Sequence, residues 1–88
     1  MKYLIIYELN NKSKNYSGLY DAIKNSGSEW WHYLETAWIV ESSRTSDQIS
    51  TQLSSYIDKG QDFLLVIKID ASQKQGWLPK EAWDWLNK

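Results

Sequence analysis

An 88-residue chain is long enough for one small domain, and a formal net charge of −1 gives no general electrostatic attraction to nucleic acid. The lack of cysteine excludes disulfides and cysteine-built metal sites, and a single histidine excludes a multi-histidine site within one chain. Six tryptophans and six tyrosines are more aromatic side chains than so small a core can hide, so several are expected at an interface or in a pocket.

The chain is expected to open with a strand and a polar loop. Lys2–Leu9 is rich in Ile, Leu and Tyr at both alternating sets of positions, which is typical of a strand covered on both faces. Its apolar run is too short for a signal peptide or a membrane span, so we expect a cytoplasmic protein with no membrane partner. Asn10–Asn15 is polar throughout and is expected to form the loop that follows.

A helix and a hairpin are expected next. Apolar side chains at 16, 19, 20 and 23 follow helical spacing, with Asn15 as the N-cap and Gly27 as the stop. Trp30–Leu34 and Ala37–Ser42 are rich in aromatic and β-branched residues, as strands are. The two residues between them, Glu35 and Thr36, predict a tight hairpin.

The second half begins with a capping box, in which Thr45 is the N-cap and Gln48 the third helical residue. Apolar residues from Ile49 to Ile57 continue the stripe of this second helix. Phe63–Ile69 is the most apolar predicted strand. After a polar linker, Pro79 opens a short helix, where its missing N–H costs nothing.

The order strand, helix, strand, strand, helix, strand, helix predicts an α+β fold, specifically a ferredoxin-like βαββαβ sandwich with a four-stranded antiparallel sheet. Residues 1–88 are expected to form this single domain, with residues 71–88 as a linker and a docked C-terminal helix. The first and last strands are placed at the centre of the sheet, because both are apolar on both faces. The C-terminal helix would cover part of their second face and a second subunit the rest, which predicts a homodimer.

Four segments resemble a family of small bacterial and phage proteins often labelled SinR-like: YLIIYEL, SEWWHYLETAWIVES, DFLLVIKID and GWLPKEAWDWL. The resemblance covers nearly the whole chain and is most specific at Trp30–Leu34 and Gly76–Leu86. The label implies a DNA-binding regulator. The sequence has no helix-turn-helix pattern, so this function is not carried over.

The layout is also similar to the CRISPR adaptation nuclease subunit, a dimeric ferredoxin-like protein. In that family an acidic residue, usually Asp, ends the first strand and is proposed to bind a divalent metal near the dimer axis. The matching position here holds Glu8. The resemblance therefore implies a Mg²⁺ or Mn²⁺ site at Glu8, shared between subunits, because such ions prefer carboxylate oxygens.

The block from Trp30 to Tyr33 is the first candidate ligand site. Neighbouring strand residues point to opposite faces, so Trp30 and His32 would share one face while Trp31 and Tyr33 share the other. We expect one pair in the core and the other at a pocket or subunit interface. Aromatic rings there would stack a nucleobase, worth roughly 1–3 kcal/mol per base. The alternative is that all four fill the core or an interface.

The end of the first strand and its loop are the second candidate site. Its members are Tyr7, Glu8, Asn10, Lys12 and Lys14. The two lysines would meet phosphate, or else only keep the loop soluble.

His32 and Trp77 are further candidates for contact with a ligand. His32 has no neighbouring nucleophile, which favours a structural or ligand-binding imidazole over a catalytic one. Trp77 joins the candidate ligand contacts, although tryptophans near a short helix more often serve its docking.

Three functions remain open. The leading hypothesis is a non-enzymatic homodimeric binding module that holds or sequesters a nucleotide-like ligand or a short single-stranded nucleic acid, with no cofactor. The second is a metal-dependent nuclease of the CRISPR-adaptation type that uses Glu8 with Mg²⁺ or Mn²⁺. The third is a structural protein-interaction domain whose aromatic residues form subunit contacts.

Overall fold

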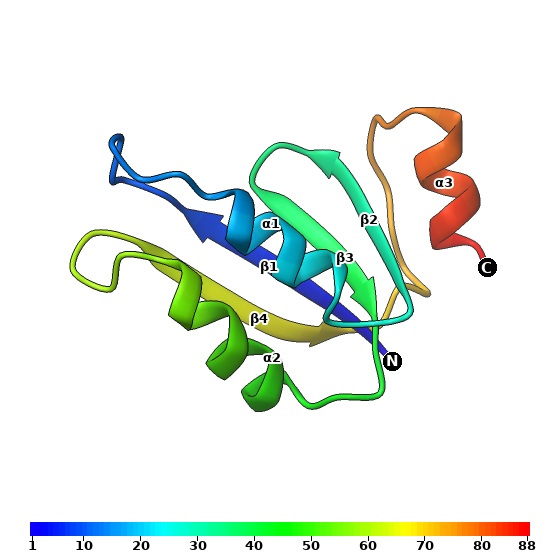
Figure 1. Ribbon diagram of the computed structural model, residues 1–88. Helices are drawn as coiled ribbons and strands as arrows, with labels where there is room; N and C mark the ends of the chain where they lie inside the picture. The colour runs from blue at the N-terminus through cyan, green and yellow to red at the C-terminus, as the bar shows by residue number, and fades with distance from the viewer.

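Four strands form one antiparallel sheet, with two helices on one face and a third helix against part of the other (Figure 1). The structure is a computed structural model that describes residues 1–88. The elements are β1 (Lys2–Glu8), α1 (Ser17–Lys24), β2 (Glu29–Leu34), β3 (Ala37–Glu41), α2 (Ser46–Leu53), a 3₁₀ turn (Ser54–Tyr56), β4 (Phe63–Ile69) and α3 (Lys80–Leu86). The predicted α+β class is confirmed. None of the helices has the length and apolar composition needed to cross a membrane.

The strand order is β2-β3-β1-β4, so β1 and β3 are central and β4 is an edge strand. The prediction that the last strand is central was therefore wrong. The second hydrogen-bonding edge of β1 is taken by β3, which pairs with it from Lys2 to Ile6. The apolar composition of β4 has another cause. Leu64 and Val66 pack on the helix-side core, while the residues that alternate with them face the opposite side.

Helix α2 begins as its sequence predicts. The Thr45 hydroxyl accepts from the Gln48 amide at 3.1 Å, and the Gln48 side chain accepts from the Thr45 amide at 3.0 Å, so the capping box is confirmed. The helix ends at Leu53, whereas its apolar stripe was predicted to continue to Ile57 and the helix to end at Lys59 and Gly60. Serines in the Ser54–Tyr56 turn donate to backbone carbonyls three residues earlier, which competes with regular helical bonding.

The main core lies between the helices and the sheet. Its fully buried side chains come from both central strands and both helices: Ile5, Leu19, Ile23, Trp38, Val40, Ile49 and Leu53. Burying one such aliphatic side chain contributes about 1.5–3 kcal/mol. This layer therefore holds the loops at the ends of β1 and β2 in place.

A second, smaller core holds α3 against the other face of the sheet. Trp31 and Ile39 from the sheet pack with Ala82 and Leu86 from the helix. The Trp31 indole also donates to the Ala82 carbonyl at 3.2 Å. A seven-residue helix is unstable alone in water, so these contacts are what keep α3 formed.

Candidate functional site

The β2–β3 hairpin carries a one-residue register shift in the middle of the aromatic block. Trp31 pairs with Ile39 and Leu34 with Ala37, so two residues of β2 lie opposite the single residue Trp38. This irregularity has the residue count of a β-bulge, which bends a strand and interrupts strict alternation. Glu35 and Thr36 form the tight turn that the sequence predicts.

Trp30 and His32 both contact Trp38 on the helix-covered side of the sheet. The His32 ring stacks on the Trp38 ring with centroids 3.6 Å apart, and the Trp30 ring is tilted against it at 5.5 Å. Trp31 and Tyr33 contact each other at 5.4 Å. The pairs therefore meet as the sequence predicts, but burial does not divide along the same line. Only Trp31 is buried, at 3% exposure, whereas Trp30 is 45% and Tyr33 43% exposed.

A row of aromatic rings links this block to the loop after β1. The Tyr20 ring stacks on Trp38 at 6.2 Å, and the Tyr7 ring lies 6.2 Å from Tyr20. The Trp38 indole donates to the Tyr7 hydroxyl at 3.1 Å, and that hydroxyl lies 3.1 Å from the Glu35 carbonyl, to which it donates. Burial raises the pKa of Tyr7, so its phenol stays protonated and able to donate.

Beside the Tyr7 end of this row lies a hollow of about 320 Å³. We call it the tyrosine–lysine hollow after five of its lining residues: Tyr7, Lys12, Lys14, Tyr16 and Tyr20. The Lys14 ammonium lies 6.0 Å from the centre of the Tyr16 ring. Glu35 is the one acidic side chain in the lining, against two lysines. The hollow thus offers aromatic surface and excess positive charge, a combination that suits a planar anion.

Asp62 fixes the loop that carries these lysines. Its buried carboxylate accepts from the Asn10 amide at 2.6 Å, the Tyr16 hydroxyl at 2.6 Å and the Asp58 amide at 2.8 Å. Burial opposes ionisation of Asp62, but the hydrogen bonds from Tyr16 and from backbone amides outweigh it and lower the pKa of the carboxyl. The ionised form therefore ties the β1–α1 loop to the start of β4.

Replacing Asp62 with asparagine is expected to lower the midpoint of thermal unfolding near neutral pH. Because the folded-state pKa is lowered, the stabilisation is fully present above the unfolded pKa of about 3.9 and is lost as pH falls through the folded pKa. Thermal melts should show a gap between the melting temperatures of wild type and Asp62→Asn that narrows as the pH falls below about 3.9. Asp84→Asn, which changes an exposed carboxylate, is the control. A gap that stays constant with pH would refute this role.

Glu8 lies exposed at the end of β1, where its carboxylate accepts from the Asn10 side chain at 3.2 Å. Asp70 lies at the opposite end of the sheet, because β4 runs antiparallel to β1 and Glu8 pairs with Phe63. No group of three or more acidic or histidine side chains that could hold a metal ion is present. Within one chain, Glu8 therefore belongs to no acidic or histidine cluster of three or more residues.

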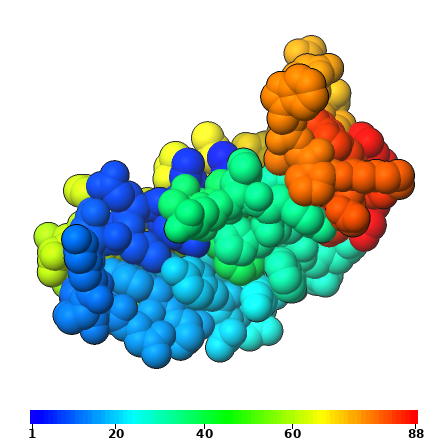
Figure 2. All heavy atoms as spheres, turned by 90° about the horizontal axis from the view of Figure 1, so that it is seen from above, coloured from blue at the N-terminus to red at the C-terminus, as the bar shows by residue number.

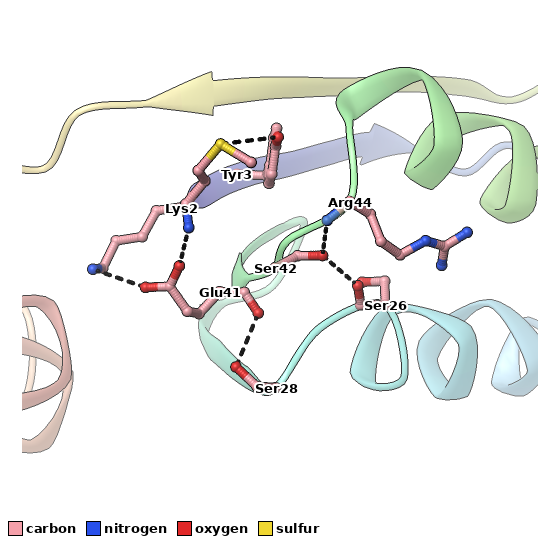
Figure 3. Close-up of polar contacts among 8 residues, drawn as sticks. Lys2, Tyr3, Ser26, Ser28, Glu41, Ser42 and Arg44 are labelled. Atoms are coloured by element: carbon pink, nitrogen blue, oxygen red, sulfur yellow. Dashed lines mark hydrogen bonds and ion pairs between the residues drawn. The ribbon is translucent and has the colours of Figure 1, made fainter.

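The remaining polar cluster closes the other end of the sheet (Figure 3). Ser42 donates to the Ser26 carbonyl at 2.8 Å and accepts from the Arg44 amide at 3.1 Å. A Cβ on Gly27 would lie 2.1 Å from the Glu41 carbonyl oxygen, so this turn requires glycine. The Glu41 carboxylate accepts a hydrogen bond from the N-terminal ammonium, and this bond lowers the pKa of the Glu41 carboxyl. These polar groups bind other segments of the chain, so few of them are free to contact a ligand.

The face of the sheet away from α1 and α2, the open face, is only half covered. Helix α3 covers the part around Trp31 and Ile39, and Leu4 of β1 and Ile69 of β4 pack against the same cluster, while Leu34 at the end of β2 stays exposed. The uncovered part exposes apolar side chains, which we call the β1–β4 patch: Ile6 (38% exposed), Phe63 (67%), Leu65 (54%) and Ile67 (46%).

No protein-family model matches this chain, and no curated protein matches it by sequence. Among solved structures, the hypothetical protein TT1823 from Thermus thermophilus is similar, with a TM-score of 0.63. The match covers 89% of this chain and 93% of that chain at 16% sequence identity. This likeness supports the small α+β fold with its antiparallel sheet and does not address function. The SinR-like and CRISPR-type resemblances remain predictions.

The structure brings some predicted site residues together and separates others. Tyr7, Lys12 and Lys14 share the tyrosine–lysine hollow, and Asn10 anchors its loop. Trp31 serves the α3 core, and Trp77 lies in the tail between β4 and α3.

The contribution of Tyr16 and Tyr20 to the hollow was not predicted, because their helical stripe was assigned to the core. They instead pack at the margin of the core and line the hollow. Their phenol hydroxyls were the signal in the sequence, because a tyrosine hydroxyl needs a polar partner and so favours the margin of a core.

Proposed function

We propose that this chain is a non-enzymatic binding module that works as a homodimer in the cytoplasm. The β1–β4 patch is its subunit contact, and the tyrosine–lysine hollow of each subunit is its ligand site. The proposal also assigns the fold to the ferredoxin-like class. The strand order β2-β3-β1-β4, the antiparallel pairing, and the two helices on one face support that assignment.

The uncovered β1–β4 patch is the observation that carries the proposal. Its four side chains together expose roughly 400 Å² of apolar surface, as large as the biggest patches on typical monomers, which are often functional. Leaving it in water would forgo stabilisation that an 88-residue domain, with its small core, cannot easily replace. A second copy of the chain carries further exposed apolar surface of its own, with which it can cover this patch.

A charge placed in the middle of the patch is expected to separate the subunits without unfolding them. Leu65→Asp would bury an unpaired carboxylate in the dimer and raise the dissociation constant by about 100-fold or more. Sedimentation equilibrium measures this change. Ser17→Asp, on the opposite side of the sheet, adds the same charge and should leave the dimer intact. If Leu65→Asp sediments as wild type does, the patch is not the subunit contact.

The ligand proposed for the hollow is a nucleotide-like molecule or a short single strand. Stacking of its base on Tyr16 or Tyr20 and contact of its phosphate with Lys12 and Lys14 are supported by the shared lining of the hollow.

Adenosine monophosphate is a suitable probe of this site. Titration followed by NMR should shift amide signals of the β1–α1 loop, and Lys14→Gln should weaken binding about ten-fold, the loss expected for one charge-assisted hydrogen bond. Lys74→Gln, in the tail, is the matched control. Shifts spread evenly over the surface, or equal loss in both variants, would reject the hollow as a binding site.

A further inference from the structure

Trp77 is the most exposed apolar residue of the chain, with 99% of its surface accessible. It lies in the tail between β4 and α3, next to Leu78, which packs against the α3 core. The base of this tail is therefore anchored, while the indole touches nothing in its own chain. A tryptophan can bury about 150–250 Å² when it finds a partner.

The tail stands out from the molecule on the side of the open face. Figure 2 shows the tail, in orange, projecting beyond the rest of the chain, on the side away from α1. The open face therefore has a raised part, where α3 and the tail lie over Trp31, Ile39, Leu4 and Ile69, and a low part that contains the β1–β4 patch.

A second copy fits this profile. When two open faces meet about a two-fold axis, the raised part of each can lie over the low part of the other. The contact is then self-complementary, as a two-fold interface requires. Contact of two identical low parts alone would leave the raised parts in collision or the patches apart.

The surface area of the patch also indicates that the patch alone is too small for a stable dimer contact. A stable interface removes about 800 Å² per partner, and the β1–β4 patch offers only about half of that. The side chain of Trp77 adds about 150–250 Å² per subunit, roughly half of the remainder.

We infer that Trp77 of each subunit docks on the β1–β4 patch of its partner, so that the two tails are exchanged across the dimer. The inference rests on the proposed homodimer and adds its geometry. The tail is an interaction arm, and the patch is its receptor on a second copy of this chain.

Replacing Trp77 with alanine tests the arm. Its side chain is fully exposed in the single chain, so the variant should melt as wild type does under conditions where both are monomeric. Sedimentation equilibrium should show a dissociation constant raised about 10- to 100-fold, as for a buried aromatic anchor. A dissociation constant within two-fold of wild type would overturn the arm while leaving the dimer standing. A monomeric wild type would instead overturn the proposed function.

A crosslinking experiment tests the geometry without removing the indole. The chain has no cysteine, so Gln75→Cys on the tail and Glu8→Cys beside the patch introduce single thiols. When the two variants are mixed with a short bis-maleimide, the mixed product should form readily. Gln75→Cys mixed with Ser17→Cys, whose thiol lies on the α1 side, is the control. Equal yields from both mixtures would overturn the inference.

Discussion

Replacing Trp38 with alanine should leave too little stability to fold. Trp38 is buried between α1 and the sheet, and its ring contacts those of Tyr20, Trp30 and His32. Loss of a buried tryptophan costs about 3–5 kcal/mol, which is comparable to the whole stability of a small domain. Far-ultraviolet circular dichroism and a thermal melt measure the outcome.

Trp38→Phe is the matched control for this site. It keeps an aromatic ring against His32 but removes the indole N–H that donates to Tyr7. We expect a folded protein that is weakened by about 1–3 kcal/mol, because Tyr7 loses a buried donor. If Trp38→Ala melts within a few degrees of wild type, the aromatic row does not hold the sheet to α1.

Trp31→Ala and Trp30→Ala are expected to behave very differently, although the residues are adjacent. Trp31 is buried and donates to the Ala82 carbonyl, so its loss opens the second core and releases α3, at a cost of about 3–5 kcal/mol. Trp30 is nearly half exposed, with the Lys24 ammonium 5.0 Å from its ring centre, so its loss should cost about 1 kcal/mol or less.

Chemical denaturation gives both free energies, and hydrogen exchange at the α3 amides shows whether that helix is released. Fast exchange at α3 in Trp31→Ala alone is the expected result. Equal losses in the two variants would mean that the hairpin faces are not divided as described. Deletion of residues 80–88 is a useful reference, because it should match Trp31→Ala in the exchange of the remaining sheet.

Elements set by local chemistry were predictable from the sequence. The capping box at Thr45 has two specific side-chain acceptors at fixed spacing, and it appears where expected. The cap of α1 shows the usual uncertainty of one residue. Asn15 was predicted as the N-cap, whereas the helix begins at Ser17 after Tyr16. The Asn15 side chain still accepts from the Ser17 amide at 2.9 Å, so the capping chemistry is present one residue early.

Features that depend on distant segments were not predictable. The edge position of β4 follows from the pairing of β3 with β1, and nothing in the Phe63–Ile69 sequence distinguishes a central strand from an edge strand that is apolar on both faces. The register shift in β2 opposite Trp38 likewise has no signature in the local sequence. Lys12 and Lys14 were predicted as ligand contacts from the sequence. That they line the same hollow as Tyr16 and Tyr20 could be seen only from the folded structure.

The mass of the unmodified protein in solution tests the central claim most directly. Sedimentation equilibrium at micromolar concentration should give twice the 10.4 kDa chain mass, because the half-covered open face is complete only when a second copy lies on it. A species of 10.4 kDa that persists as the concentration is raised would contradict the homodimer and, with it, the account of the β1–β4 patch.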